Sequence, residues 1–219
     1  MTRLLDLGLT RITNVILNMA EISERSVAKA IESYEEGSVN KDEIFEWAKQ
    51  LQLLQEEVSE LAVELFARYQ PVATDLRFIK SSMEIAYGFA RFGGYAHDIV
   101  DIISTMGSVS HCDKRAVLEV SQIAIKMTRM SVLALQTADK DAADKLYEMD
   151  ETVEALYRKF LREAITPHGK RGSNKLYADP RCYVSGLLIL RYLERISDHA
   201  CSIASAVKYI ATGTPARRL

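Results

Sequence analysis

Two pairs of acidic side chains are the residues in this sequence best suited to chemistry, because each pair is spaced four positions apart. The pairs are Asp150 with Glu154 and Glu194 with Asp198. On a helix, such spacing places both carboxylates on one face, one turn apart. They repel each other unless a cation lies between them, and their oxygens suit a hard or borderline metal ion. The spacing alone also fits a solvated face on which Arg191 and Arg195 form weak exposed ion pairs.

An internal repeat helps to choose between these two interpretations. The stretch DLRFIKSSMEIAYGFARFGGYAHDIVDI at 75–102 recurs 104 positions later, so that Asp75 matches Asp179 and Arg91 matches Arg195. A second match, at an offset of 95, aligns Leu51 with Leu146. At these offsets, the four acids correspond to uncharged residues, namely Gln55, Ser59, Ala90 and Gly94. Independent surface charges have no reason to disappear together, whereas losing one cation site removes all its ligands. The repeat therefore favours a metal site.

Six long helices are expected to position these acids. The sequence contains only four prolines and is rich in good helix formers. Loops are predicted near 37–40, 67–73, 107–113, 137–140 and 166–179. The predicted fold is all-α, with two tandem three-helix bundles that form a rod and each close a core of their own. The predicted domains are 1–107 and 113–212, followed by a frayed tail at 213–219.

Apolar periodicity and capping residues support this division. Apolar residues recur at intervals of three and four positions in two matching stretches, which we call seams because such a stripe packs against a neighbouring helix. The seams are Ile44, Trp47, Leu51, Leu54, Val58, Leu61 and Leu65, and then Leu146, Met149, Val153, Leu156 and Phe160. Gly37 is predicted to end the first helix, and Asn40 with Glu43 to begin the second. Pro71 is predicted in the first turn of the third helix, and Asp179 with Pro180 should start the sixth.

Composition excludes several classes of protein. With 28 basic and 30 acidic residues, the net charge of -2 gives no general attraction to nucleic acid. No apolar run approaches the ~18 residues of a membrane span, so any action at a membrane is expected only through partner proteins. The first residues do not resemble a secretory signal. The three cysteines are odd in number and lack CxxC spacing, which favours a reducing cytoplasm over disulfides.

Other candidate sites have weaker support. The histidines are scattered and are interpreted as surface or interface residues: His97, His111, His168 and His199. No Glu-x-x-His pair of a di-metal oxidase occurs, and no nucleotide-binding or hydrolase motif, so no enzyme activity is expected. A basic cluster in the 166–179 loop is either solvated or contacts phosphate or an acidic partner: His168, Lys170, Arg171 and Lys175.

The segments QPVATDLRFI at 70–79 and YLERISDHACSIA at 192–204, within two three-helix repeats, resemble the PhoU family of phosphate-uptake regulators. The resemblance covers essentially the whole chain. It implies a cytoplasmic helical protein, often a dimer, that binds iron, zinc or multinuclear metal clusters through an acid followed four residues later by Asp. Glu194 and Asp198 match that motif, whereas Ala90 and Gly94 depart from it. The first repeat, with Asp98 and Asp101 nearby, should therefore stay empty or bind weakly.

The expected function is that of a non-enzymatic, metal-binding, negative regulator of phosphate uptake and homeostasis. The resemblance implies that it acts through the ATPase of the phosphate ABC transporter, through a sensor kinase, or through both. Iron or zinc is the expected metal. A homodimer is expected because four aromatic residues lie off the seams: Phe45, Phe66, Phe78 and Tyr95. The alternatives are a metal-free scaffold or accessory module of another transporter, and a carboxylate-metal hydrolase or oxidase.

Overall fold

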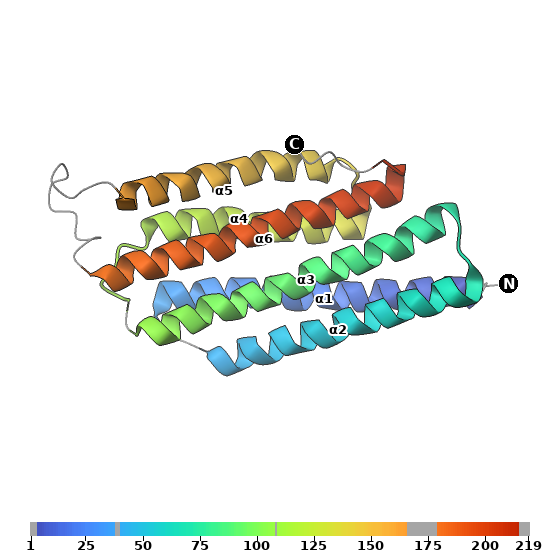
Figure 1. Ribbon diagram of the computed structural model, residues 1–219, viewed down its shortest axis with the longest axis horizontal. Helices are drawn as coiled ribbons and strands as arrows, with labels where there is room; N and C mark the ends of the chain where they lie inside the picture. The colour runs from blue at the N-terminus through green and yellow to red at the C-terminus, as the bar shows by residue number, and fades with distance from the viewer. Residues whose placement is uncertain (1–3, 38–39, 108, 166–178, 215–219) are drawn as a thin grey trace.

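The computed structural model describes residues 4–37, 40–107, 109–165 and 179–214, and these form six α-helices without a strand (Figure 1). The helices are α1 (Leu4–Glu36), α2 (Lys41–Tyr69), α3 (Ala73–Met106), α4 (Arg115–Thr137), α5 (Ala142–Ile165) and α6 (Pro180–Thr212). The all-α prediction is confirmed, and so are the loops predicted near 67–73, 107–113 and 137–140. The predicted loop at 166–179 lies almost wholly outside the described residues. Among the described residues, no helix combines the length and the apolar character needed to cross a membrane.

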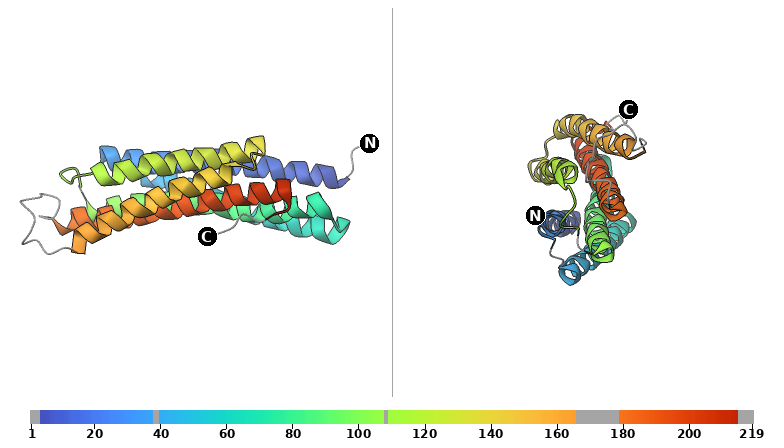
Figure 2. Two further views of the ribbon diagram at one scale, coloured as in Figure 1. Left: turned by 90° about the horizontal axis from the view of Figure 1, so that it is seen from above. Right: turned by 90° about the vertical axis from the view of Figure 1, so that its left-hand side faces the viewer.

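α3 and α6 form the centre of the molecule. Their mutual contact is the most extensive between any two helices. They run side by side in Figure 1, and the end-on view on the right of Figure 2 also shows α6 next to α3. α1 and α2 pack on α3, while α4 and α5 pack on α6 in the same way. α1 also contacts α4, so the two three-helix units meet along their sides.

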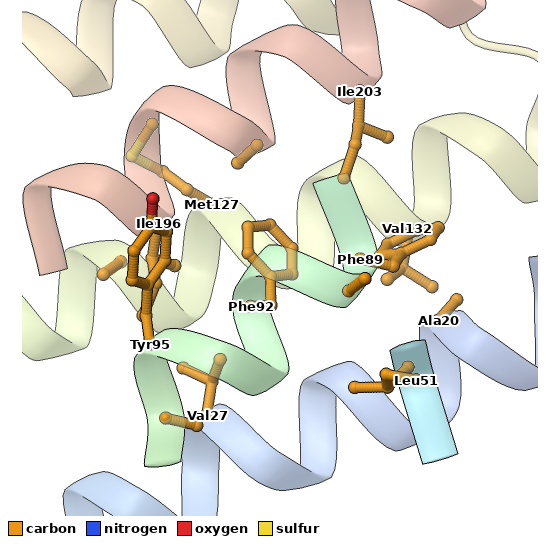
Figure 3. Close-up of a cluster of buried hydrophobic side chains, with 14 of the residues drawn as sticks. Ala20, Val27, Leu51, Phe89, Phe92, Tyr95, Met127, Val132, Ile196 and Ile203 are labelled. Atoms are coloured by element: carbon orange, nitrogen blue, oxygen red, sulfur yellow. The ribbon is translucent and has the colours of Figure 1, made fainter. Parts of the chain in front are cut away.

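The expectation that each unit closes a separate core is wrong. Buried side chains from all six helices form one continuous cluster. In its centre, Phe89 and Phe92 of α3 lie near Met127 of α4 and Ile196 and Ile203 of α6 (Figure 3). The physical reason is that α3 and α6 each have several neighbours and bury apolar residues on more than the one stripe that the repeat revealed.

Close approach of α3 to α6 depends on Gly88. A Cβ atom at this position would lie 2.8 Å from Cγ1 of Ile203, which is fully enclosed in the core. Atoms of buried side chains cannot move far without opening space elsewhere. Gly94, six residues further along the same helix, has no atom within 4 Å of the equivalent position.

Two predicted helix ends are confirmed. Gly37 ends α1 with a φ of 73° and donates its N–H to the carbonyl oxygen of Ser33 at 2.9 Å. Asp179 caps α6, because its Oδ1 accepts a hydrogen bond from the backbone N–H of Arg181 at 2.9 Å. Pro180 occupies the first helical position, where its missing N–H costs nothing.

Two other predicted helix starts differ in detail. Asn40 flanks α2, but its side chain does not cap the helix and instead donates from Nδ2 to Oε2 of Glu43 at 2.9 Å. Pro71 lies before α3 rather than in its first turn, since Val72 has extended backbone angles and the helix begins at Ala73.

The prediction against disulfides is wrong, because Cys112 and Cys182 form one. Cys112 lies in the loop between α3 and α4, and Cys182 lies in the first turn of α6. They are 70 positions apart in the sequence, and only the packing of α6 beside that loop brings them together. Cys201 is buried and free.

The two glycines of α3 generate a matched stability test. Gly88→Ala should lower the free energy of unfolding by about 1–3 kcal/mol, because the new methyl group overpacks the contact with Ile203. Gly94→Ala should raise it by up to ~1 kcal/mol, since alanine is the better helix former and the position is open. Urea denaturation followed by circular dichroism measures both. Equal effects of the two variants would contradict this account of the α3–α6 contact.

Candidate metal centre

The four predicted acids lie on adjacent helices. Asp150 and Glu154 belong to α5, while Glu194 and Asp198 belong to α6. α5 packs on α6 through its seam, of which Leu146, Val153 and Phe160 are buried. The structure therefore places both acid pairs along one helix–helix contact, and their charges influence one another across it.

Asp150 carries the most unusual carboxylate of the four. Its Oδ1 atom is buried and, in the described part of the chain, has no hydrogen-bond partner. Burial raises the pKa of Asp150, the charges of Asp198 and Glu154 raise it further, and the nearby Ser197 hydroxyl acts in the opposite direction. That hydroxyl donates its own proton to the backbone carbonyl oxygen of Glu194 at 2.8 Å. A buried acceptor without a donor is costly, and a bound cation would satisfy it.

Glu194 is not part of a solvated face, because only 12% of its side chain is exposed. Burial raises its pKa, as does the charge of Asp198. Arg191 opposes this shift, and its Nη1 donates to both carboxylate oxygens of Glu194 at 2.9 Å. The ion pair allowed by the sequence therefore exists, but it lies in a largely enclosed position.

The remaining two acids also have basic partners. Nη1 of Arg195 lies 3.2 Å from Oδ2 of Asp198, whose side chain is 40% exposed. Glu154 pairs with Arg158, one turn further along α5. Arginines thus supply positive charge to three of the acids, while the buried oxygen of Asp150 has no such partner among the described residues.

These residues fit a cation by their chemistry rather than by a preformed geometry. All four donors are carboxylates, which bind hard and borderline metals, and Asp150 presents an oxygen that no other described residue satisfies. No three of the four bring ligand oxygens within 4.8 Å of one another. Binding to one ion by all four would require the arginine partners to yield and the carboxylates to move closer.

The corresponding place in the first repeat has no carboxylate at any of the four matched positions. The Ser59 hydroxyl donates to the backbone carbonyl oxygen of Gln55 at 3.0 Å, and Ala90 is buried in the core. Asp101 pairs with Lys41 of α2. Burial raises the pKa of Asp98, and the charges of His97 and Arg91 counteract that shift. The prediction that this repeat binds metal weakly or not at all stays a prediction.

One group of potential ligands was missed from the sequence. His111, Cys112 and Cys182 have ligand atoms within 4.8 Å of one another, although His111 was interpreted as a surface residue and the cysteines as unpaired. The adjacent His-Cys pair in a short polar loop was the available signal, but nothing in the sequence shows that α6 begins beside it. His97 and His199 pack against aromatic rings, and the basic cluster of the 166–179 loop lies outside the described residues.

Two relatives of this chain carry the same name and match it over nearly its whole length. A relative from Pseudomonas aeruginosa, named a phosphate-specific transport system accessory protein PhoU homolog, is 29% identical over 93% of this chain and 84% of its own length. A relative of the same name from Clostridium acetobutylicum is 28% identical over 97% of both chains.

The fold is shared with solved structures. A crystal structure of PhoU from Pseudomonas aeruginosa matches with a TM-score of 0.85 and 27% identity, covering 95% of this chain and 99% of that one. The phosphate transport system regulatory protein PhoU from Streptococcus pneumoniae matches with a TM-score of 0.83 at 19% identity, over 98% of this chain and all of that one, which supports the fold alone. The model of the PhoU domain matches twice, at residues 16–103 and 117–207. Because these matches account for most of the sequence, one in each three-helix unit, the chain belongs to the PhoU family.

Proposed function

We propose that this chain is a non-enzymatic accessory protein of a phosphate transport system that restrains phosphate uptake and so contributes to phosphate homeostasis. The observation that carries the proposal is the match to PhoU domains in both repeats, together with relatives of that name over nearly the whole chain.

The proposed partner is the ATPase of the phosphate ABC transporter, a sensor kinase, or both, contacted in the cytoplasm. Action at the membrane through these partners agrees with the lack of a membrane-crossing helix in the described part of the chain. α2 presents Leu53 and Val63 with exposures of 60% and 61%, and such apolar side chains suit a protein contact.

A homodimer is also proposed, although most of the aromatic residues that suggested it are covered within the monomer. Of those four, Tyr95 is buried, Phe66 and Phe78 are partly buried against the core, and Phe45 is 47% exposed. The support for the dimer is therefore the exposed ring of Phe45, rather than all four aromatic residues.

We further propose that the second repeat binds a divalent or ferric metal ion, with iron or zinc foremost. The ligands would be the carboxylates of Glu194, Asp198, Asp150 and Glu154. The support is the buried Oδ1 of Asp150, which has no hydrogen-bond partner among the described residues. The charges of Asp198 and Glu154 raise the pKa of Asp150, and the charges of Asp198 and Asp150 raise that of Glu194. A bound ion would neutralise this repulsion and compete with the arginines for the same oxygens.

The first prediction of this proposal concerns pH and the metal-free protein. Because the folded-state pKa values of Asp150 and Glu194 are raised, the folded chain retains protons that the unfolded chain has lost. These groups should therefore make folding less stable as pH rises through the carboxylate range. Asp150→Asn should raise stability at neutral pH and reduce that decline, measured by denaturation at several pH values with chelator present.

The control for this prediction is Glu148→Gln, which removes the same charge from an exposed residue of α5 that does not contribute to the pKa shift of Asp150. It should leave the pH dependence as in the parent chain. A larger effect of Glu148→Gln than of Asp150→Asn would show that net charge, and not the buried carboxylate, governs the decline.

The second prediction concerns metal content. Glu194→Ala combined with Asp198→Ala should abolish bound metal in elemental analysis and the metal-dependent rise in melting temperature. In the parent chain, free metal at 100 times the Kd should stabilise folding by about 2.7 kcal/mol. Affinity should increase as pH rises, since protons compete for the same carboxylates.

The matched control removes Asp98 and Asp101 from the first repeat and should retain the metal. If the Glu194 and Asp198 double variant keeps the metal content of the parent chain, the site lies elsewhere. If the parent chain itself takes up no metal, the metal-free scaffold is the better description.

The third prediction concerns the partner. The full chain, carrying an affinity tag, should recover a phosphate transporter ATPase or a sensor kinase from cells grown with ample or limiting phosphate. The tag alone serves as the control. Recovery of the components of a different transporter, without either of these proteins, would favour an accessory role in another transport system. In a separate assay, hydrolysis of phosphate esters by the purified chain would favour the hydrolase alternative.

A further inference from the structure

A second group of metal ligands lies where the loop between α3 and α4 meets the start of α6. His111 and Cys112 come from the loop, and Cys182 comes from the first turn of the helix. Nε2 of His111 lies 3.4 Å from Sγ of Cys182 and 4.0 Å from Sγ of Cys112. One imidazole nitrogen and two sulfurs thus face one another, although the residues come from distant parts of the sequence.

Asp179 provides a fourth potential ligand. Its Oδ2 lies 3.0 Å from Nε2 of His111, while its Oδ1 caps α6 through the backbone N–H of Arg181. The Arg181 side chain also donates to this carboxylate, at 2.7 Å between Nη2 and Oδ2. The carboxylate is therefore held at the start of the helix with one oxygen directed toward the imidazole.

We propose that, when the disulfide is reduced, Cys112, Cys182 and His111 bind one Zn²⁺ ion, with Asp179 completing the coordination. Thiolate, imidazole and carboxylate are the groups that zinc takes in four-coordinate protein sites. The Cys182 side chain is buried and Cys112 is partly buried, whereas His111 is exposed, so the site is enclosed on one side and open to entry on the other. In the disulfide form, the two sulfurs are bonded to each other and cannot act as thiolates.

The exchange between these two states balances chemically. A dithiol reductant transfers two electrons and two protons to the Cys112–Cys182 bond, giving two protein thiols, and is itself oxidised to a disulfide. Zinc then displaces one proton from each thiol and takes the lone pair of neutral His111 at Nε2. Oxidation by a disulfide reverses the exchange, removes two electrons from the thiolates and releases the ion.

This site differs from the acidic cluster in place and in chemistry. Cys182 precedes Glu194 by twelve positions on α6, which corresponds to about 18 Å along the helix. Its sulfur ligands favour zinc, whereas the cluster of carboxylates also accepts harder ions. Both the disulfide and the zinc ion would link the loop between the repeats to the start of α6. The redox state of Cys112 and Cys182 would decide which of the two links forms.

The experiment uses the full chain, reduced with a phosphine so that no added thiol competes for metal. The phosphine is oxidised to its oxide, and water supplies the oxygen and the two protons. After the reductant is removed under inert gas, Co²⁺ is added as a spectroscopic probe and is then displaced with Zn²⁺. Thiolate-to-cobalt absorption in the near ultraviolet, lost on addition of one equivalent of Zn²⁺, is the expected result. The untreated disulfide form should show none.

Variants then assign the ligands. Cys112→Ser and Cys182→Ser each leave one of the two thiolates, so each should reduce the thiolate-to-cobalt absorption below that of the parent chain. His111→Ala should weaken cobalt binding at least ~10-fold, since even outer-shell partners contribute that much. Cys201→Ser, which alters the free cysteine, should leave the spectrum unchanged. The Glu194 and Asp198 double variant should also retain it, so failure of the proposed carboxylate site leaves this result intact.

The proposal is overturned if the reduced chain, with circular dichroism matching that of the disulfide form, shows no thiolate-to-cobalt absorption. It is equally overturned if Cys112→Ser shows the same absorption as the parent chain, or if His111→Ala binds cobalt as tightly as the parent chain. Because His111 is exposed, its replacement tests the ligand without disturbing the core.

Discussion

The packing of α3 against α6 is the contact on which the rest of the structure depends. Each of these helices is the third of its repeat, and each buries an apolar stripe together with neighbouring small residues. Gly88 allows α6 to approach closely at Ile203. Phe89 and Phe92 of α3 pack edge to face in the same buried cluster as Ile203 (Figure 3). One shared core is more extensive than two three-helix cores, and burying more apolar surface favours the combined bundle.

This packing also creates the chemical environment of the acids. α6 is surrounded by α3, α4 and α5, so little of its surface remains open. Glu194 is consequently enclosed, and its pKa is raised because a charged carboxylate loses hydration there. Arg191 and Arg195 reduce that cost from the same helix. A metal ion at this site would have to stabilise the charged carboxylates more than these two guanidinium groups do.

The two repeats show how one architecture can carry different chemistry. Both have a helix pair at the corresponding place, and the same apolar positions hold each pair together. The acids of the second repeat correspond to Gln55, Ser59, Ala90 and Gly94 in the first. Exchanging these four residues changes the charge along the helix pair while the apolar positions that pack the helices stay the same. The Cys112–Cys182 bond adds a covalent connection between the junction of the repeats and the second of them.

The sequence by itself determined the number, extent and type of the helices. Their periodicity and several of their ends depend on local interactions, such as the αL residue Gly37 and the cap formed by Asp179. It also indicated the acid pairs, since helical spacing and an internal repeat are both readable along the chain. The family followed from two motifs in the expected order.

Only the tertiary structure decided how these elements combine. It joined the two cores, enclosed Glu194, left Oδ1 of Asp150 without a partner among the described residues, and brought Cys182 beside His111. Each of these features depends on which helix faces meet across large separations in sequence. Helical periodicity shows which side of a helix is apolar, but it does not show which other helix covers that side or how much water remains around a charge.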